Sequence, residues 1–270
     1  MNERATTHFS AIVLAGDRRA DDPLLRQSGV HCKAMLDIDG EPMVLRVLRA
    51  LKQSHHIGQR YLSGPEYQCL RDNPALGQLV ESREVEWIEP EASPSTSAYH
   101  AMARIDGNGP TLITTADHPL LTAEIVDRFC ADSSARDVDV TVGMCRYDII
   151  KAGFPGIRKT ILRFSDGDWC GCNLFAFLTP GARRLADEWR RVESQRKHPL
   201  RLVRLLGWTS VAQYLLGALS LKTALERLSR RLHLRISVVE LPFAEAAIDV
   251  DSMADRLIVQ RKLDSRNQHS

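Results

Sequence analysis

One strand and the loop after it constrain this chain more than any other feature. The run from Phe9 to Gly16 is mostly apolar and gives way to a polar stretch that closes at Lys33. In an open α/β sheet the small-molecule site lies just beyond such strand ends, where backbone N–H groups and a lysine can hold a polyphosphate. We therefore predict that this loop binds a nucleotide.

The same loop has a plainer interpretation. Gly16 lets the chain turn closely under a phosphate. Arg18, Arg19 and Lys33 offer positive charge. A strand-to-helix loop with some charge would look much the same. Three acidic residues also count against a dense phosphate cradle unless they point away or hold the arginines in place: Asp17, Asp21 and Asp22.

Short β-rich runs alternate with helical patterns, which is the sequence form of a parallel sheet with helical crossovers. We expect strands at Ala11–Leu14, Arg60–Ser63, Val85–Ile88, Thr111–Thr114, Asp139–Cys145, Thr160–Phe164, Cys172–Leu178 and Arg235–Leu241. We expect helices at Pro42–Lys52, Ser97–Arg104, Thr122–Ala131 and Ser252–Leu263. The predicted fold is a Rossmann-like, three-layer α/β/α arrangement around a mostly parallel sheet.

The predicted domain organisation is a single unit over residues 8–265. With 270 residues and 44% hydrophobic composition, the chain can bury a substantial core. We find no repeat, low-complexity tract or obvious linker, and the pattern over 181–232 is that of a basic helical insertion. The stretch 205–221 lacks charge, but it is slightly short for a membrane span and is interrupted by polar residues.

The amino terminus and the cysteines indicate a cytoplasmic protein. The first eight residues carry charge without an apolar run, unlike a secretory signal. The six cysteines lack the paired spacing of a zinc site, so we expect reduced thiols. They are Cys32, Cys69, Cys130, Cys145, Cys170 and Cys172.

Positive charge is concentrated in one segment. Residues 180–235 contain 13 lysines and arginines against 4 acidic residues, while the whole chain has a net charge of only +2. This segment is either the solvated face of a few helices or a surface for an anionic acceptor, lipid or membrane. It has no recognisable nucleic-acid motif and its aromatics are isolated, which argues against nucleic acid. Homodimerisation is left open.

Two acidic segments are candidates for a magnesium site. Asp117 ends an apolar strand, where a carboxylate can hold Mg²⁺. Asp249 and Asp251 are two apart on an extended chain, so both point to one side, and a divalent cation would relieve their repulsion. Each segment has a structural alternative. Asp117 can cap the next helix, although Thr122 stands closer, and Asp251 or Ser252 can cap the last helix.

A Ser/Pro turn supplies a further candidate. Residues 93–97 read Ser-Pro-Ser-Thr-Ser and open a helix whose free N–H groups can meet a ribose, a base edge or a phosphate. As a capped helix start, the turn needs no ligand. We take Ser97 as the candidate contact.

Taken in order, these segments resemble nucleotidyltransferases of the glycosyltransferase-A-like fold, especially the MobA-like branch with its molybdenum-cofactor guanylyltransferases and cytidylyltransferases. The likeness spans most of the chain, and its specificity lies in the order of the motifs. The matching segments are Leu14-Ala15-Gly16, Lys33, Gly40-Glu41-Pro42, Pro94-Ser95-Thr96-Ser97, Asp117-His118-Pro119 and Asp249-Val250-Asp251-Ser252.

The resemblance implies transfer of a nucleoside monophosphate from CTP or GTP to a small phosphorylated or hydroxyl acceptor, with release of pyrophosphate. It implies that the backbone around Leu14, Ala15 and Gly16 lines the triphosphate. It further implies that Lys33 neutralises phosphate charge, Ser97 helps to seat the nucleoside, and Asp117, Asp249 and Asp251 hold Mg²⁺. Asp117 is also taken as a contact of the nucleotide.

The chain departs from the family pattern after Gly16. The usual Gly-x-Gly-x-Arg continuation is replaced by Asp17-Arg-Arg-Ala-Asp-Asp-Pro, so Arg18 or Arg19 stands in for the family arginine as a catalytic residue. By the same resemblance, the strand that contains Asn173 leads into the acceptor side, where its amide is a candidate contact. The basic segment offers three more candidate contacts to the acceptor: Arg201, Arg204 and Trp208.

Two other functions remain open from the sequence. A glycosyltransferase that uses a nucleotide-sugar would need Asp-x-Asp at the central strand end, and Asp117-His118-Pro119 does not supply it. A non-catalytic nucleotide-binding protein is suggested by the altered loop and the basic helical segment.

Overall fold

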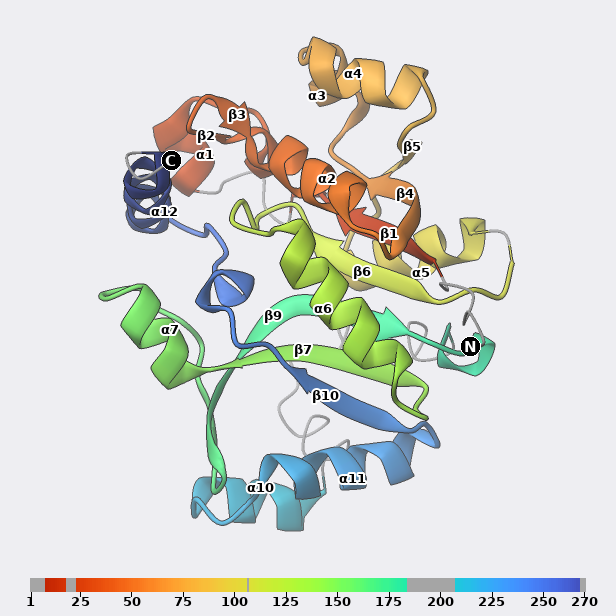
Figure 1. Cartoon of the computed structure of the whole chain (residues 1–270), viewed down its shortest axis with the longest axis vertical. Helices are drawn as coiled ribbons and strands as arrows, with labels where there is room; N and C mark the ends of the chain where they lie inside the picture. Colours follow the sequence, from red (N-terminus) through yellow and green to blue (C-terminus); the bar gives the residue numbers. More distant parts are fainter. Residues whose placement is uncertain (1–7, 18–22, 106, 184–206, 268–270) are drawn as a thin grey trace, which may run out of the picture.

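A computed structural model describes residues 8–17, 23–105, 107–183 and 207–267, built around one eight-stranded sheet (Figure 1). Its order is β10-β7-β9-β6-β1-β4-β5, with β8 paired to β9. The strands are β1 Phe9–Leu14, β4 Ile57–Ser63, β5 Glu86–Ile88, β6 Thr111–Thr115, β7 Val140–Arg146, β8 Leu162–Phe164, β9 Gly167–Phe177 and β10 Ile236–Glu240. Within this eight-stranded sheet, only the pairs made by β9 are antiparallel.

The remaining elements surround this sheet. A small antiparallel ribbon joins β2 Asp37–Ile38 to β3 Glu41–Pro42. The α-helices are α1 Pro23–Ser28, α2 Met43–Gln53, α3 Tyr67–Arg71, α4 Pro74–Glu81, α5 Pro94–Arg104, α6 Ala123–Ser134, α7 Tyr147–Gly153, α10 Trp208–Leu215, α11 Leu221–Leu232 and α12 Met253–Asn267. The 3₁₀ turns are η1 Lys33–Met35, η2 Pro180–Ala182 and η3 Ala244–Ala247.

Alternation along β1 produces the layers. Ala11 and Val13 belong to a core cluster with α2 and α6, whereas Ile12 and Leu14 belong to a second cluster with α5. Since successive side chains of a strand point to opposite faces, α2 and α6 cover one face of the sheet and α5 covers the other (Figure 1). The three-layer, mostly parallel fold predicted from the sequence is confirmed.

Helices α5 and α6 each begin directly after a capping residue. The Ser93 hydroxyl accepts a hydrogen bond of 3.3 Å from the Thr96 N–H at the start of α5. The Thr122 hydroxyl accepts one of 3.3 Å from the Ile125 N–H at the start of α6. Thr122 therefore caps α6, which leaves the Asp117 carboxylate to other partners.

Several short elements differ from the expectation. The helices α1, α3, α4 and α7 are five to eight residues long and were not predicted. Strand β9 begins at Gly167, earlier than expected, because it forms a hairpin with β8. Helices α10 and α11 lie within 181–232, where a basic helical insertion is predicted, and residues 184–206 of that segment lie outside the described ranges. Within those ranges no helix is long and apolar enough to cross a bilayer.

Candidate active site

A cavity of about 320 Å³ opens where β1 and β6 end. It receives the Gly16 turn on one side and the segment 249–251 on the other. Eight of the residues predicted from the sequence line it: Leu14, Ala15, Gly16, Lys33, Asp117, Asn173, Asp249 and Asp251. Side chains that are far apart in sequence therefore meet at one edge of the sheet.

The Gly16 turn lies directly against the neighbouring strand. The Ala15 N–H donates a hydrogen bond of 2.8 Å to the Ser63 carbonyl. A Cβ on Gly64 would lie 2.8 Å from the Gly16 nitrogen, so only glycine fits there. Asp17 accepts a hydrogen bond of 3.0 Å from the Lys33 N–H and so closes the loop, the far part of which lies outside the described residues.

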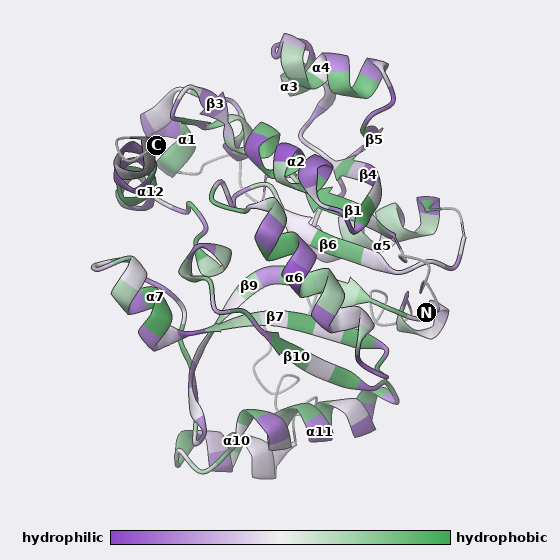
Figure 2. Ribbon diagram, in the orientation of Figure 1, coloured by the Kyte–Doolittle hydropathy of each residue, from purple (hydrophilic) through white to green (hydrophobic). Residues whose placement is uncertain are grey.

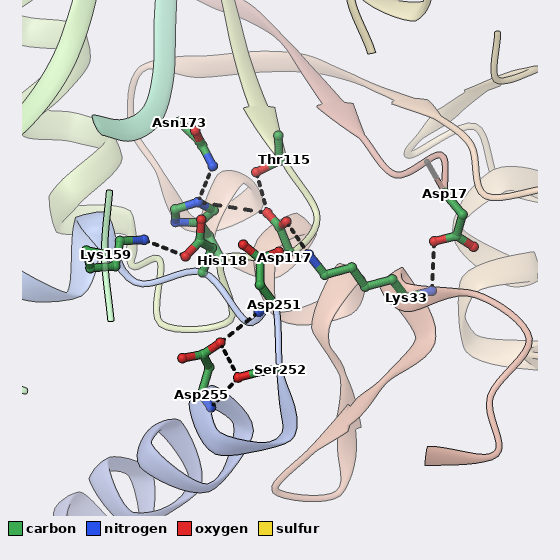
Figure 3. A network of polar contacts seen from close by, with 11 residues as sticks. Asp17, Lys33, Thr115, Asp117, His118, Lys159, Asn173, Asp251, Ser252 and Asp255 are labelled. Atoms are coloured by element: carbon green, nitrogen blue, oxygen red, sulfur yellow. Dashed lines mark hydrogen bonds and ion pairs between the residues drawn. The ribbon is translucent and has the colours of Figure 1, made fainter. Parts of the chain in front are cut away.

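Lys33 is placed between two carboxylates. Its Nζ lies 2.8 Å from Asp117 Oδ2 and 2.5 Å from Asp251 Oδ1 (Figure 3). Burial by itself would raise the pKa of Asp117, but the ammonium of Lys33 more than offsets it and holds that pKa well below its usual range. Burial would likewise lower the pKa of Lys33, and the two carboxylates raise it instead. Asp117 and Lys33 are therefore both charged at neutral pH.

Hydrogen bonds from neighbouring residues hold Asp117 and the segment of Asp251 in place. The Val250 N–H donates a hydrogen bond of 3.0 Å to the Asp117 carbonyl, which joins the late segment to the end of β6. The Thr115 hydroxyl donates one of 2.6 Å to Asp117 Oδ1. Ser252 accepts a hydrogen bond from the Asp255 N–H at the start of α12. Ser252 is therefore the cap of that helix, and the Asp251 side chain reaches Lys33.

The Asp249 carboxylate pairs with a lysine other than Lys33. Its Oδ1 pairs with the Nζ of Lys159, whose side chain is only 8% exposed. Lys159 lies between α7 and β8, and sequence reasoning missed it because no local pattern marks it. The expected cluster of three carboxylates is thus divided: two share Lys33 and the third is neutralised by Lys159.

Asn173 and His118 form a second polar contact beside the cavity. Asn173 Nδ2 lies 2.8 Å from His118 Nε2 (Figure 3). Asn173 has a φ of 49°, a left-handed conformation within β9 that turns its side chain toward the end of β6. His118 is 1% exposed, and burial lowers its pKa, so the ring is neutral and can accept from an amide.

Ser97 lies in a smaller hollow that adjoins the main cavity. The hollow has a volume of about 60 Å³ and is also lined by Gly16 and Asp117. The Ser97 hydroxyl is already engaged, because it accepts a hydrogen bond of 2.9 Å from the Glu91 N–H. Ser93 performs the capping, so Ser97 is the residue of this turn that both faces the hollow and orders the loop before the helix.

The other predicted contacts are not brought together by the described structure. Trp208 lies on α10 and is not among the residues that line the cavity. Arg18, Arg19, Arg201 and Arg204 lie outside the described residues.

The carboxylates of the cavity are the candidate ligands for a metal ion. Within the described ranges, no three His, Cys, Asp or Glu side chains are grouped to hold a metal ion. Asp117 and Asp251 nevertheless share one cation, and Mg²⁺ commonly takes one or two carboxylates together with substrate phosphates. These two side chains are the residues that could hold a divalent ion.

The chain is similar to several solved structures. A solved structure titled as a hypothetical transferase from Thermus thermophilus is 30% identical, covers 92% of this chain and 99% of its own, and has a TM-score of 0.77. CMP:2-keto-3-deoxy-manno-octonic acid synthetase complexed with CTP is 13% identical, with coverage of 96% and 99% and a TM-score of 0.57. 4-Diphosphocytidyl-2C-methyl-D-erythritol synthase from Anaerococcus prevotii is 10% identical, with coverage of 96% and 100% and a TM-score of 0.55.

The last two likenesses show the fold alone. A search of curated proteins finds no match to the chain. The model of the MobA-like NTP transferase domain matches residues 11–234, which is most of the sequence. The chain belongs to the family of MobA-like NTP transferase domains.

Proposed function

We propose that this protein transfers a nucleoside monophosphate from CTP or GTP to a small phosphorylated or hydroxyl acceptor and releases pyrophosphate. One observation carries the proposal: Lys33 bridges Asp117 and Asp251 at the cavity that also receives the Gly16 turn. A triphosphate beside that turn meets a fixed positive charge. An acceptor that enters from the side of Asn173 meets the same phosphates.

Magnesium fits the carboxylate donors of the cavity. Asp117 and Asp251 present hard oxygen ligands toward one cation, and substrate phosphates can complete an octahedral shell. Asp249 stays close by, paired with Lys159. When bound, Mg²⁺ would neutralise charge on the phosphate oxygens and orient them for displacement.

The protein's own residues position the substrates and stabilise the charge on the phosphates. Lys33, once its acids have another cation, can turn its ammonium to the phosphates. Asn173, steadied by His118, can hydrogen-bond the acceptor, and Ser97 borders the space beside the turn. An acceptor phosphate is already ionised, so in-line attack needs positioning and charge stabilisation more than a base.

Thermal unfolding with each of the four NTPs, with and without Mg²⁺, tests the proposal. A ligand that binds only the folded state stabilises it, by about 2.7 kcal/mol at one hundred times its dissociation constant. We expect one NTP, CTP or GTP, to raise the melting temperature most, and only with Mg²⁺ present. Asp117→Asn should lose this dependence on Mg²⁺. Asp132→Asn, which removes a surface ion pair on α6, should keep it.

Two results would contradict the proposal. One is an absence of stabilisation by all four NTPs, and the other is unchanged Mg²⁺ dependence in Asp117→Asn. Pyrophosphate release is then measured against phosphorylated and hydroxyl acceptors. Nucleotide binding without turnover for any acceptor would favour a non-catalytic nucleotide-binding protein.

A further inference from the structure

Helix α10 turns its apolar residues away from the protein. Trp208, Leu215 and Leu216 are 69%, 79% and 81% exposed. Trp208 and Leu215 occupy positions i and i+7 and so share one side of the helix, and Leu216 follows as its C-cap; we call these three residues the apolar stripe. The opposite side packs on α11, where the buried Ser210 hydroxyl accepts a hydrogen bond of 2.9 Å from Arg227. In most helices at a protein surface the apolar side faces the core.

Positive charge borders the apolar stripe. The Arg231 guanidinium lies 3.9 Å from the position that a Cβ on Gly207 would take, just before the stripe begins. The exposed Arg163 donates its backbone N–H to the Tyr214 hydroxyl of α10 at 3.3 Å. Strongly hydrophilic residues recur along the neighbouring α11 (Figure 2). The described stretch 207–235 has five basic residues and one acidic residue.

This pattern restricts what can cover the stripe. A second copy of the chain would bring the same positive rim, so a symmetric contact would place like charges together. The complementary surface is apolar at its centre and negative around it. Helix α10 lies at one end of the molecule (Figure 1), which suits a flat surface.

We propose that α10 docks on the surface of an anionic lipid bilayer. The apolar stripe reaches the boundary between headgroups and acyl chains, with Trp208 at the level of the headgroups. Arg163 and Arg231, which lie beside α10, contact lipid phosphates. This contact is independent of the proposed nucleotidyl transfer, since none of these residues lines the cavity.

Co-sedimentation with vesicles tests the contact. The full chain is mixed with vesicles of phosphatidylcholine alone or of phosphatidylcholine with phosphatidylglycerol. We expect binding to the anionic vesicles that is about tenfold stronger than to the neutral ones and that weakens as salt is added. The double variant Leu215→Glu, Leu216→Glu should bind anionic vesicles about tenfold more weakly than the wild type.

The control is Leu257→Glu on α12, an equally apolar residue that is 57% exposed and lies outside the stripe. It should bind like the wild type, and circular dichroism checks that both variants stay folded. The proposal is overturned if wild type does not bind anionic vesicles or if the double variant binds them equally well. Light scattering that shows a mass doubling lost in the double variant, without vesicle binding, would make the stripe a self-association surface and also overturn it.

Discussion

At the scale of single residues, Gly64 shows how closely the Gly16 turn is held. Gly64 has a φ of 84°, and an added Cβ would lie 2.8 Å from the Gly16 nitrogen and 2.9 Å from the Ala15 carbonyl carbon. Backbone atoms cannot move aside as the end of a flexible side chain can. The position of the turn therefore depends on the absence of a side chain one strand away.

We expect Gly64→Ala to lower the free energy of unfolding by about 1–3 kcal/mol, because it adds both a clash and an unfavourable φ. Urea denaturation measures the change. Gly109→Ala is the matched control, since a Cβ there would have nothing within 4 Å. Its effect should stay within about 0.5 kcal/mol. Equal denaturation midpoints for the two variants would show that the Gly16 turn has more room than the structure gives it.

The residues of the site were predictable to different degrees. Asp117 and Gly16 follow strands that lie side by side and parallel, so their meeting at one edge could be inferred. Thr115 stands two residues before Asp117, a spacing that could have revealed it as a partner. Lys159 could not be found, because it pairs with a carboxylate 90 positions away and nothing local marks it.

At the scale of elements, Asp139 ties three neighbouring strands together. It precedes β7 and accepts hydrogen bonds of 3.0 Å from the Thr179 hydroxyl after β9 and 2.8 Å from the Arg235 N–H before β10. Its side chain is 16% exposed. Hydrogen bonds from Arg235 outweigh the effect of burial and lower its pKa below the ordinary 3.8.

We expect Asp139→Asn to lower the free energy of unfolding at pH 7 by about 1–2 kcal/mol. A carboxyl whose pKa is lower in the folded state stabilises above its ordinary pKa, and this contribution disappears as pH falls through the folded value. The gap between wild type and variant should therefore shrink below pH 3.8 in denaturation experiments. Asp137→Asn, which removes a 93% exposed partner of the same Arg235, should have little effect at any pH. A gap for Asp139→Asn that stays constant with pH would contradict the assignment.

The elements missed from the sequence share one cause. Helices α3 and α7 span only five and seven residues, too short for a helical period to stand out from a loop. Their stability comes from tertiary packing: α7 lies against η3, where Gly153 approaches Ala244. The longer helices α2 and α6 have two or more turns of apolar spacing and were predicted to within a few residues.

At the scale of the whole molecule, all six cysteines are buried free thiols. Burial raises the pKa of Cys145 to about 12, and it raises the pKa values of Cys130, Cys170 and Cys172 as well. The reactive form of cysteine is the thiolate, so the native protein should expose almost none of it at neutral pH.

We expect Ellman's reagent to label the native protein only at the rate at which the fold opens, and to titrate all six thiols at once in guanidinium chloride. Labelling followed over time at neutral pH measures the difference, with the unfolded sample as its control. Rapid reaction of one or more thiols in native buffer would place a cysteine at the surface, contrary to the structure.

Lys33 supplies the cavity with a resident counter-ion. Its ammonium already pairs with the acids at 117 and 251, so a divalent ion arriving alone would have to displace it and leave the Lys33 charge without an anion. A triphosphate that accompanies the ion avoids this cost, because its oxygens can pair with the Lys33 ammonium when Asp117 and Asp251 bind the ion. Under the proposed function, a divalent ion would therefore enter together with the nucleotide and be held by Asp117 and Asp251, while Lys33 pairs with the phosphates.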